Sequence, residues 1–119
     1  MRIGIPAEIK DIKGPVSNNF GRTQYYFIYD DSNEHFEFIL NSAAQSQGGA
    51  GVKAAQTVAD SKVDVLITPQ LGENAAAVLK AAKIVIYKCE EGSLLDNIKL
   101  LKDGQLSLLS DIHQGYHGH

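Results

Sequence analysis

The sequence is poor in cysteine, methionine and tryptophan. Its 119 residues include one cysteine, one methionine and no tryptophan. A single cysteine excludes a framework of internal disulfides, and it excludes a metal site built only from thiolates of one chain. Cys89 has Lys88 beside it, but Glu90 and Glu91 oppose a lowered thiol pKa. We therefore interpret Cys89 as an incidental residue at a strand end and not as a nucleophile.

Long hydrophobic runs are also missing. No apolar run approaches the length of about 20 residues that a membrane-spanning helix needs. The hydrophobic share of 44% and the charged share of 21% are ordinary for a globular domain. The first residues, Met1 to Pro6, favour a strand over a signal peptide. We expect a cytoplasmic protein without a membrane partner, with one domain over residues 1–110 that buries a core without disulfides.

Positive charge is scarce overall, and it is concentrated at the start of the chain. The net charge of −3 argues against non-specific binding of nucleic acid. Residues 1–22 are nevertheless net positive, whereas residues 23–119 are net negative. A loop that follows the first strand would therefore favour an anion, although the protein is acidic.

The segment from Val63 to Tyr87 organises the expected fold. Val63–Ile67 is a short apolar run typical of a buried strand, Ala75–Lys83 has apolar residues at helical spacing, and Ile84–Tyr87 is a second strand pattern. Two strands joined by a helix must run parallel. The loop Thr68–Asn74 then lies at the carboxyl end of a strand and the amino end of a helix, where open α/β sheets bind anionic ligands.

The remaining patterns complete an α/β domain. Arg2–Pro6 predicts a first strand, and Gln24–Asp30 with His35–Leu40 predicts an antiparallel hairpin. Helices are expected from Val52 to about Ser61 and over Ser93–Lys102, and a short extended segment over 106–109. The order predicts a ribonuclease H-like three-layer α/β/α architecture. Its mixed five-stranded sheet would contain the antiparallel hairpin, with three helices on the two faces.

Two glycine-containing segments remain outside this pattern. Gln47–Gly51 matches neither a Walker loop nor a dinucleotide fingerprint, so its glycines are interpreted as helix-entry residues, with close approach to a ligand as the second possibility. Residues 111–119 are expected to form a flexible tail. Its His113, His117 and His119 could bind a metal through neutral imidazoles, although a tail without function is as compatible with the sequence.

Catalytic carboxylates are not arranged for two-metal nuclease chemistry. Such a site needs converging acids, including one in the middle of the first strand, where this chain has Gly4 between isoleucines. Glu8, Asp30, Asp31 and Asp64 fall on a loop, a turn and a strand start. We therefore expect no enzymatic activity, and a hydrolase is the weakest of the alternatives.

Four segments together resemble the dinitrogenase iron–molybdenum cofactor biosynthesis family: Ser17–Arg22, Tyr25–Asp30, Val63–Ile67 and Leu71–Ala75. The resemblance covers nearly all of residues 1–110. It implies a ribonuclease H-like protein that binds, carries or protects a metal–sulfur cluster of the Fe-S, Fe-Mo or Mo-S type without turning over a substrate. Cluster donor and acceptor proteins would be its partners. Family members often have His before Phe-Gly, whereas this chain has Asn19, and an amide is a weaker ligand than imidazole.

The resemblance and the anion argument together predict one binding site between two loops. The departure at Asn19 implies another cluster, or a cluster held mainly without covalent ligands. The expected cofactor-binding residues are Asn19, Phe20, Gly21, Arg22, Gln70, Leu71, Gly72, Glu73 and Asn74. The alternative for single residues is structural, with Phe20 in the core and the glycines in turns. The alternative for the protein is a regulatory or interaction module whose exposed hairpin Tyr25–Leu40 pairs with a partner or with itself.

Overall fold

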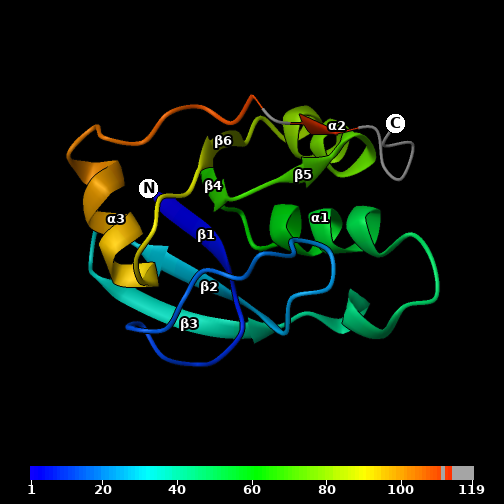
Figure 1. Cartoon of the computed structure of the whole chain (residues 1–119), viewed down its shortest axis with the longest axis horizontal. Coiled ribbons are helices and arrows are strands. Elements are labelled where there is room, and N and C mark those ends of the chain that lie inside the picture. Colours follow the sequence, from blue (N-terminus) through cyan, green and yellow to red (C-terminus); the bar gives the residue numbers. More distant parts are fainter. Residues whose placement is uncertain (111, 114–119) are drawn as a thin grey trace.

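A computed structural model describes residues 1–110 and 112–113 of the chain (Figure 1). In chain order its elements are β1 (Arg2–Ala7), β2 (Tyr25–Asp30), β3 (His35–Leu40), the 3-10 helix η1 (Ser42–Gln45), α1 (Ala50–Asp60), β4 (Val65–Thr68), β5 (Leu71–Gly72), α2 (Glu73–Ala81), β6 (Val85–Lys88), α3 (Leu94–Lys102) and β7 (Ile112–His113). None of these helices is long and apolar enough to cross a membrane.

The main sheet is mixed and has the strand order β3-β2-β1-β4-β6. β1, β4 and β6 run parallel, and β2 runs antiparallel to both of its neighbours. The expected α/β class, with five strands, an antiparallel hairpin and three α-helices, is therefore confirmed for the described residues. β1 lies in the middle of this order, and β3 and β6 are the two edge strands.

Two separate apolar cores cover the two faces of the sheet. α1 and α2 pack on one face, and α3 lies on the opposite side (Figure 1). Ile28 and Leu66 belong to the core beneath α1 and α2, whereas Ile3, Ile5 and Phe27 belong to the core beneath α3. Alternate residues of a strand point to opposite faces, so a strand covered on both sides must be apolar throughout. The β1 residues Ile-Gly-Ile-Pro-Ala, which are all buried, meet this requirement, and the charged Arg2 lies at the half-buried start of the strand.

The three helices differ in how they begin. α3 starts with a reciprocal capping box: the Ser93 hydroxyl accepts from the Asp96 N–H at 3.0 Å, and the Asp96 carboxylate accepts from the Ser93 N–H at 2.9 Å. These bonds lower the pKa of Asp96. α1 and α2 begin after Gly49 and Gly72, which provide no side-chain cap. Their first-turn N–H groups therefore donate no hydrogen bond to an N-cap side chain.

The structure contains short elements that the periodicity did not predict. β5 lies inside the expected loop Thr68–Asn74 and pairs in parallel with β7, so that Leu71 is opposite Ile112 and Gly72 is opposite His113. β7 falls in the segment for which a tail without regular structure is expected. The rest of that segment, residues 111 and 114–119 with His117 and His119, lies outside the described residues.

Candidate functional site

The two loops of the expected site lie side by side at one end of the sheet. The Gln70 side chain donates from Nε2 to the Asn18 carbonyl at 3.0 Å. The first loop also folds back along the end of β1, because the Ser17 N–H donates to the Pro6 carbonyl at 2.8 Å and Val16 bridges Ala7. The rim formed by the carboxyl ends of β1 and β4 therefore carries both loops.

Side-chain hydrogen bonds fix the shape of the first loop. The buried Ser17 hydroxyl donates to a Glu8 carboxylate oxygen at 2.8 Å and accepts from the Asn19 N–H at 3.2 Å. The Asn19 side-chain oxygen accepts from the Arg22 N–H at 2.9 Å. Asn19 therefore uses its oxygen to close the turn. The side-chain amide nitrogen Nδ2 of Asn19 makes no hydrogen bond to the described residues, so it can donate to a ligand.

Phe20 and Leu71 point into the core and not into the rim. Phe20 is 5% exposed and Leu71 is 1% exposed, and both belong to the core beneath α1 and α2. The Phe20 ring packs on Tyr26 with 5.4 Å between ring centroids, and the Phe20 carbonyl accepts from the Tyr26 hydroxyl. Burial raises the pKa of Tyr26, which keeps this hydroxyl protonated as a donor. The side chains of these two residues therefore anchor the two loops to the core.

Arg22 holds the segment that leads into α1. Its Nη1 donates to the Ala44 carbonyl at 3.1 Å and to the Ser46 carbonyl at 2.8 Å. The Ser46 hydroxyl also accepts from the Lys53 ammonium at 2.8 Å. The guanidinium is therefore a clamp between the first loop and the approach to α1, and its charge lies beside that approach.

The first turn of α1 meets the first loop on one side and the first turn of α2 on the other. A Cβ added at Gly21 would lie 3.2 Å from both Cα and N of Gly51, and one added at Gly51 would lie 3.7 Å from the Ala75 Cβ. Neither helix has a side-chain N-cap. Because uncapped first-turn N–H groups carry the positive end of the helix dipole, two such ends and a loop form one positively polarised surface.

Not every predicted residue favours an anion at this surface. Glu73 is exposed in the first turn of α2, where its carboxylate partly neutralises the helix dipole. Asn74 is exposed one residue further, and Gly72 is half-buried at the N-cap position. The expected binding residues did not include Gly49–Gly51 at the start of α1, where the sequence analysis gave close approach to a ligand only as the second possibility. The glycines of that segment were the sequence feature that could have indicated these residues, because glycine allows one backbone to approach another closely.

Comparison with family models identifies the family of this chain. Residues 1–104 match the family model described as dinitrogenase iron-molybdenum cofactor. The chain belongs to this family. The family resemblance seen in the sequence is thereby confirmed, and the iron–molybdenum cofactor theme applies to the family as a whole.

Two solved structures share the fold over nearly their whole length, and a third protein is similar in sequence. The apo form of the orange protein from Desulfovibrio gigas is 29% identical with a TM-score of 0.87, and the similarity covers 92% of this chain and 93% of that one. A putative NifB protein from Thermotoga is 32% identical with a TM-score of 0.82 over 96% and 97% of the two chains. An uncharacterized protein from Methanocaldococcus jannaschii is 29% identical over 109 residues, which are 89% of each chain.

A preassembled protein metal site is absent from the described part of this family member. No group of three or more His, Cys, Asp or Glu side chains there is placed to hold a metal ion. Of the three predicted histidine ligands, only the backbone of His113 is described, opposite Gly72 at the rim. Cys89 is half-buried, and burial raises the pKa of its thiol, which keeps it protonated and a weak ligand.

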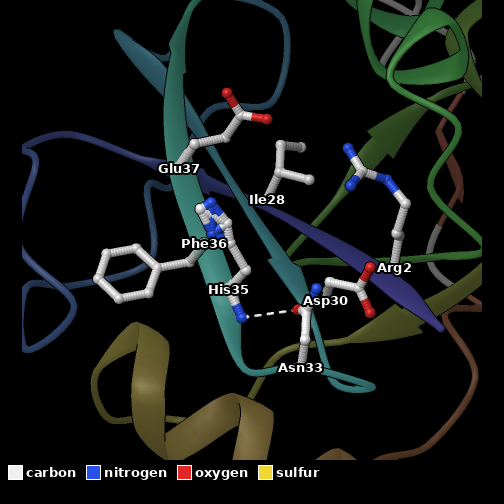
Figure 2. Close-up of a pocket in the computed structure, with 7 residues that line it drawn as sticks. All are labelled: Arg2, Ile28, Asp30, Asn33, His35, Phe36 and Glu37. Carbon is white, nitrogen blue, oxygen red and sulfur yellow. Dashed lines mark hydrogen bonds between the residues drawn. The ribbon is translucent and has the colours of Figure 1, made fainter.

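A small hollow of about 80 Å³ lies at the other end of the sheet (Figure 2). It is lined by Arg2, Ile28, Asp30, Asn33, His35, Phe36 and Glu37. Arg2 is opposite Asp30 in the β1–β2 register, near the amino end of β1 and the hairpin turn. The Arg2 Nε already donates to the Ser61 carbonyl at 3.0 Å. This hollow is thus separate from the rim that carries the predicted residues of the family site.

A matched pair of glycine substitutions tests the contact between the first loop and α1. Gly21→Ala places a methyl group against the Gly51 backbone, which cannot rotate away, so we expect a loss of about 1–3 kcal/mol in the free energy of unfolding. Gly51→Ala adds a methyl group at ordinary contact distance from Ala75 inside a helix. It should therefore be neutral or stabilise by up to about 1 kcal/mol.

Urea unfolding of the two variants and the parent measures both changes. The opposite signs decide the interpretation, since both substitutions add a methyl group, one against the Gly51 backbone and one against the Ala75 side chain. A Gly21→Ala variant as stable as the parent would contradict the close approach of the loop to α1.

Proposed function

We propose that this protein binds a metal–sulfur cluster of the Fe-S, Fe-Mo or Mo-S type as cargo, and carries or protects it without catalysing a reaction. The observation that supports this most directly is that the start of α1, which has no side-chain cap, contacts both the first loop and the similarly uncapped start of α2. Metal–sulfide clusters are usually anionic, and N–H groups at helix starts and in loops are suitable donors to sulfide. Membership of the iron-molybdenum cofactor family supports this class of cargo.

The donor groups at the rim favour a cluster held without bonds from protein to metal. The rim offers hydrogen-bond donors, which are the backbone N–H groups at the starts of α1 and α2 and the side-chain amide nitrogen of Asn19. The positive charge of Arg22 attracts an anion. None of these groups is a good metal ligand. Phe20 and Leu71 lie behind these donors and exclude water from the core side, which strengthens the contacts. We assign the three-layer arrangement to the ribonuclease H-like class as part of this proposal.

Carriage implies two kinds of protein partner, one that donates the cluster and one that accepts it. A non-enzymatic role is supported by the distribution of the acids, since Glu8 follows β1 at the rim whereas Asp30 and Asp64 lie near the other end of the sheet. The second candidate function, an interaction module, is favoured by one observation: no described segment pairs with the outer side of β3.

Anaerobic reconstitution tests the cargo proposal. Apo protein is mixed with iron, molybdate and sulfide in separate and combined additions, desalted, and measured for retained metal and for charge-transfer absorption. Retention of a stoichiometric, sulfide-dependent chromophore is the expected result. A colourless and metal-free product under every combination would remove the basis of the proposal. The protein should be prepared without nickel resin, because the histidines near its carboxyl end could take up nickel.

A further inference from the structure

The two edge strands of the main sheet, β3 and β6, differ in whether another described segment pairs with their outer side. Beyond β6, the segment around Leu108 closes the edge: the Lys88 N–H donates to the Ser107 carbonyl at 2.9 Å, and the Leu109 N–H donates to the Ile86 carbonyl at 3.0 Å. At the other edge, no described segment pairs with the outer side of β3. An open strand edge is a template for pairing with another strand.

The register identifies which residues of β3 offer their backbone at this edge. Tyr25 is opposite Leu40, and the Asn41 N–H donates to the Gln24 carbonyl at 3.0 Å in continuation of the same register. Since alternate residues of an antiparallel strand bond to the same neighbour, the odd-numbered residues of β3 face β2. The N–H and C=O groups of Phe36, Phe38 and Leu40 therefore face outward.

The same three residues form an apolar surface at the edge. Leu40 is 67% exposed and Phe36 is 44% exposed, and Phe38 is half-buried. Behind them, the Phe27 ring packs against Phe38 and Phe36 with centroid distances of 5.1 Å and 5.6 Å. The phenylalanine layer on the α3 side of the sheet thus continues to the open edge. Figure 2 shows the Phe36 side chain directed away from Glu37, which lies on the other face.

The hairpin is also electrically polar along its length. At the Leu40 end, the Lys10 ammonium lies 5.3 Å from the ring centroid of Tyr25, which is opposite Leu40. The turn at the other end carries three carboxylates: Asp30, Asp31 and Glu34. Only Asp31 has an ion pair within the described residues, with the amino terminus at 2.9 Å. An antiparallel neighbour of the same sequence would bring the basic end of one hairpin to the acidic end of the other.

We propose that a second copy of this chain pairs antiparallel with β3 about a two-fold axis at Phe38. Phe36 of each copy is then opposite Leu40 of the other, and the two sheets join into one. An axis at Glu37 would place two carboxylates directly opposite each other, and an axis at Phe36 would leave an overlap of only three strand residues on each copy. The ligand-binding rims of the two copies lie at opposite ends of the joined sheet. Pairing therefore does not depend on the cargo.

The mass of the protein in solution tests the pairing. Sedimentation equilibrium of the parent should show reversible dimers that weaken as salt rises. Leu40→Glu puts a charge into the apolar surface and faces the acidic turn of the second copy, so it should raise the dimer dissociation constant at least tenfold. Leu108→Glu is the matched control: Leu108 is 64% exposed at the closed edge, and its substitution should leave the dissociation constant unchanged.

Disulfide trapping tests the register in a Cys89→Ser background. Phe38→Cys places two thiols opposite each other across a hydrogen-bonded pair, about 5.5 Å apart at Cα, which a disulfide can span. Leu40→Cys places them about 14 Å apart along the strand direction, too far for a disulfide. Rapid covalent dimers of the first variant and not of the second are expected. A parent that stays monomeric at millimolar concentration and low salt, or equal effects of Leu40→Glu and Leu108→Glu, would overturn the proposal.

Discussion

Phe20→Ala should lower the free energy of unfolding by about 3–5 kcal/mol, a large part of the stability of a domain of this size. The side chain is 5% exposed, packs on Tyr26 and belongs to the core beneath α1 and α2. Removing the ring leaves a cavity and frees the first loop from the sheet, so retention of a cluster should fall with stability. Urea unfolding and metal retention after reconstitution measure the two effects.

The exposed Leu108 provides the control for this substitution. Leu108→Ala removes an apolar side chain that is 64% exposed, and such surface changes usually stay within about 0.5 kcal/mol. A Phe20→Ala variant that loses less than about 1 kcal/mol would show that the ring is not part of the core. In that case the structural role of Phe20, which the sequence analysis gave as the alternative to a place in the binding site, would be wrong.

The outcome for Phe20 illustrates how far the sequence determines the site. The apolar runs and helical spacing were sufficient for the five main strands and the three helices, because burial on two faces requires apolar strands. They could not decide whether Phe20 points inward or outward, since one aromatic residue in a loop has no periodicity. The contact with Tyr26 that decides it joins two segments whose relative position only the tertiary fold sets.

The short elements and the long-range contacts could not be predicted from the sequence for the same physical reason. The β5–β7 pair has two residues on each strand, so neither strand has an alternation that a pattern can detect. The clamp from Arg22 to the Ala44 and Ser46 carbonyls depends on where a loop passes. α1 starts at Ala50, two residues before the expected Val52, because Ala50 and Gly51 carry little apolar signal. The glycines that reduce the signal also bring the backbone of α1 to the first loop.

Asn74→Asp should lower cluster retention strongly while leaving the fold intact or more stable. Asn74 is exposed in the first turn of α2, and aspartate has almost the same shape as asparagine. A carboxylate there interacts favourably with the helix dipole, by about 0.3–1 kcal/mol, so the free energy of unfolding should stay level or rise. For an anionic cluster at the same helix start, the new charge is repulsive. We expect at least a tenfold weaker retention of metal, measured after anaerobic reconstitution and desalting.

Asn33→Asp is the matched control, since it makes the same change of charge and shape at the far end of the sheet. The Asn33 side-chain oxygen accepts from the His35 N–H at 2.9 Å, and a carboxylate oxygen can keep this bond. The net charge of the two variants is identical, so any difference in retention reports the position of the charge. Equal retention by both variants would mean that the cargo does not lie at the start of α2. Opposite signs for stability and retention in Asn74→Asp would instead locate the anion there, because unfolding lowers both together.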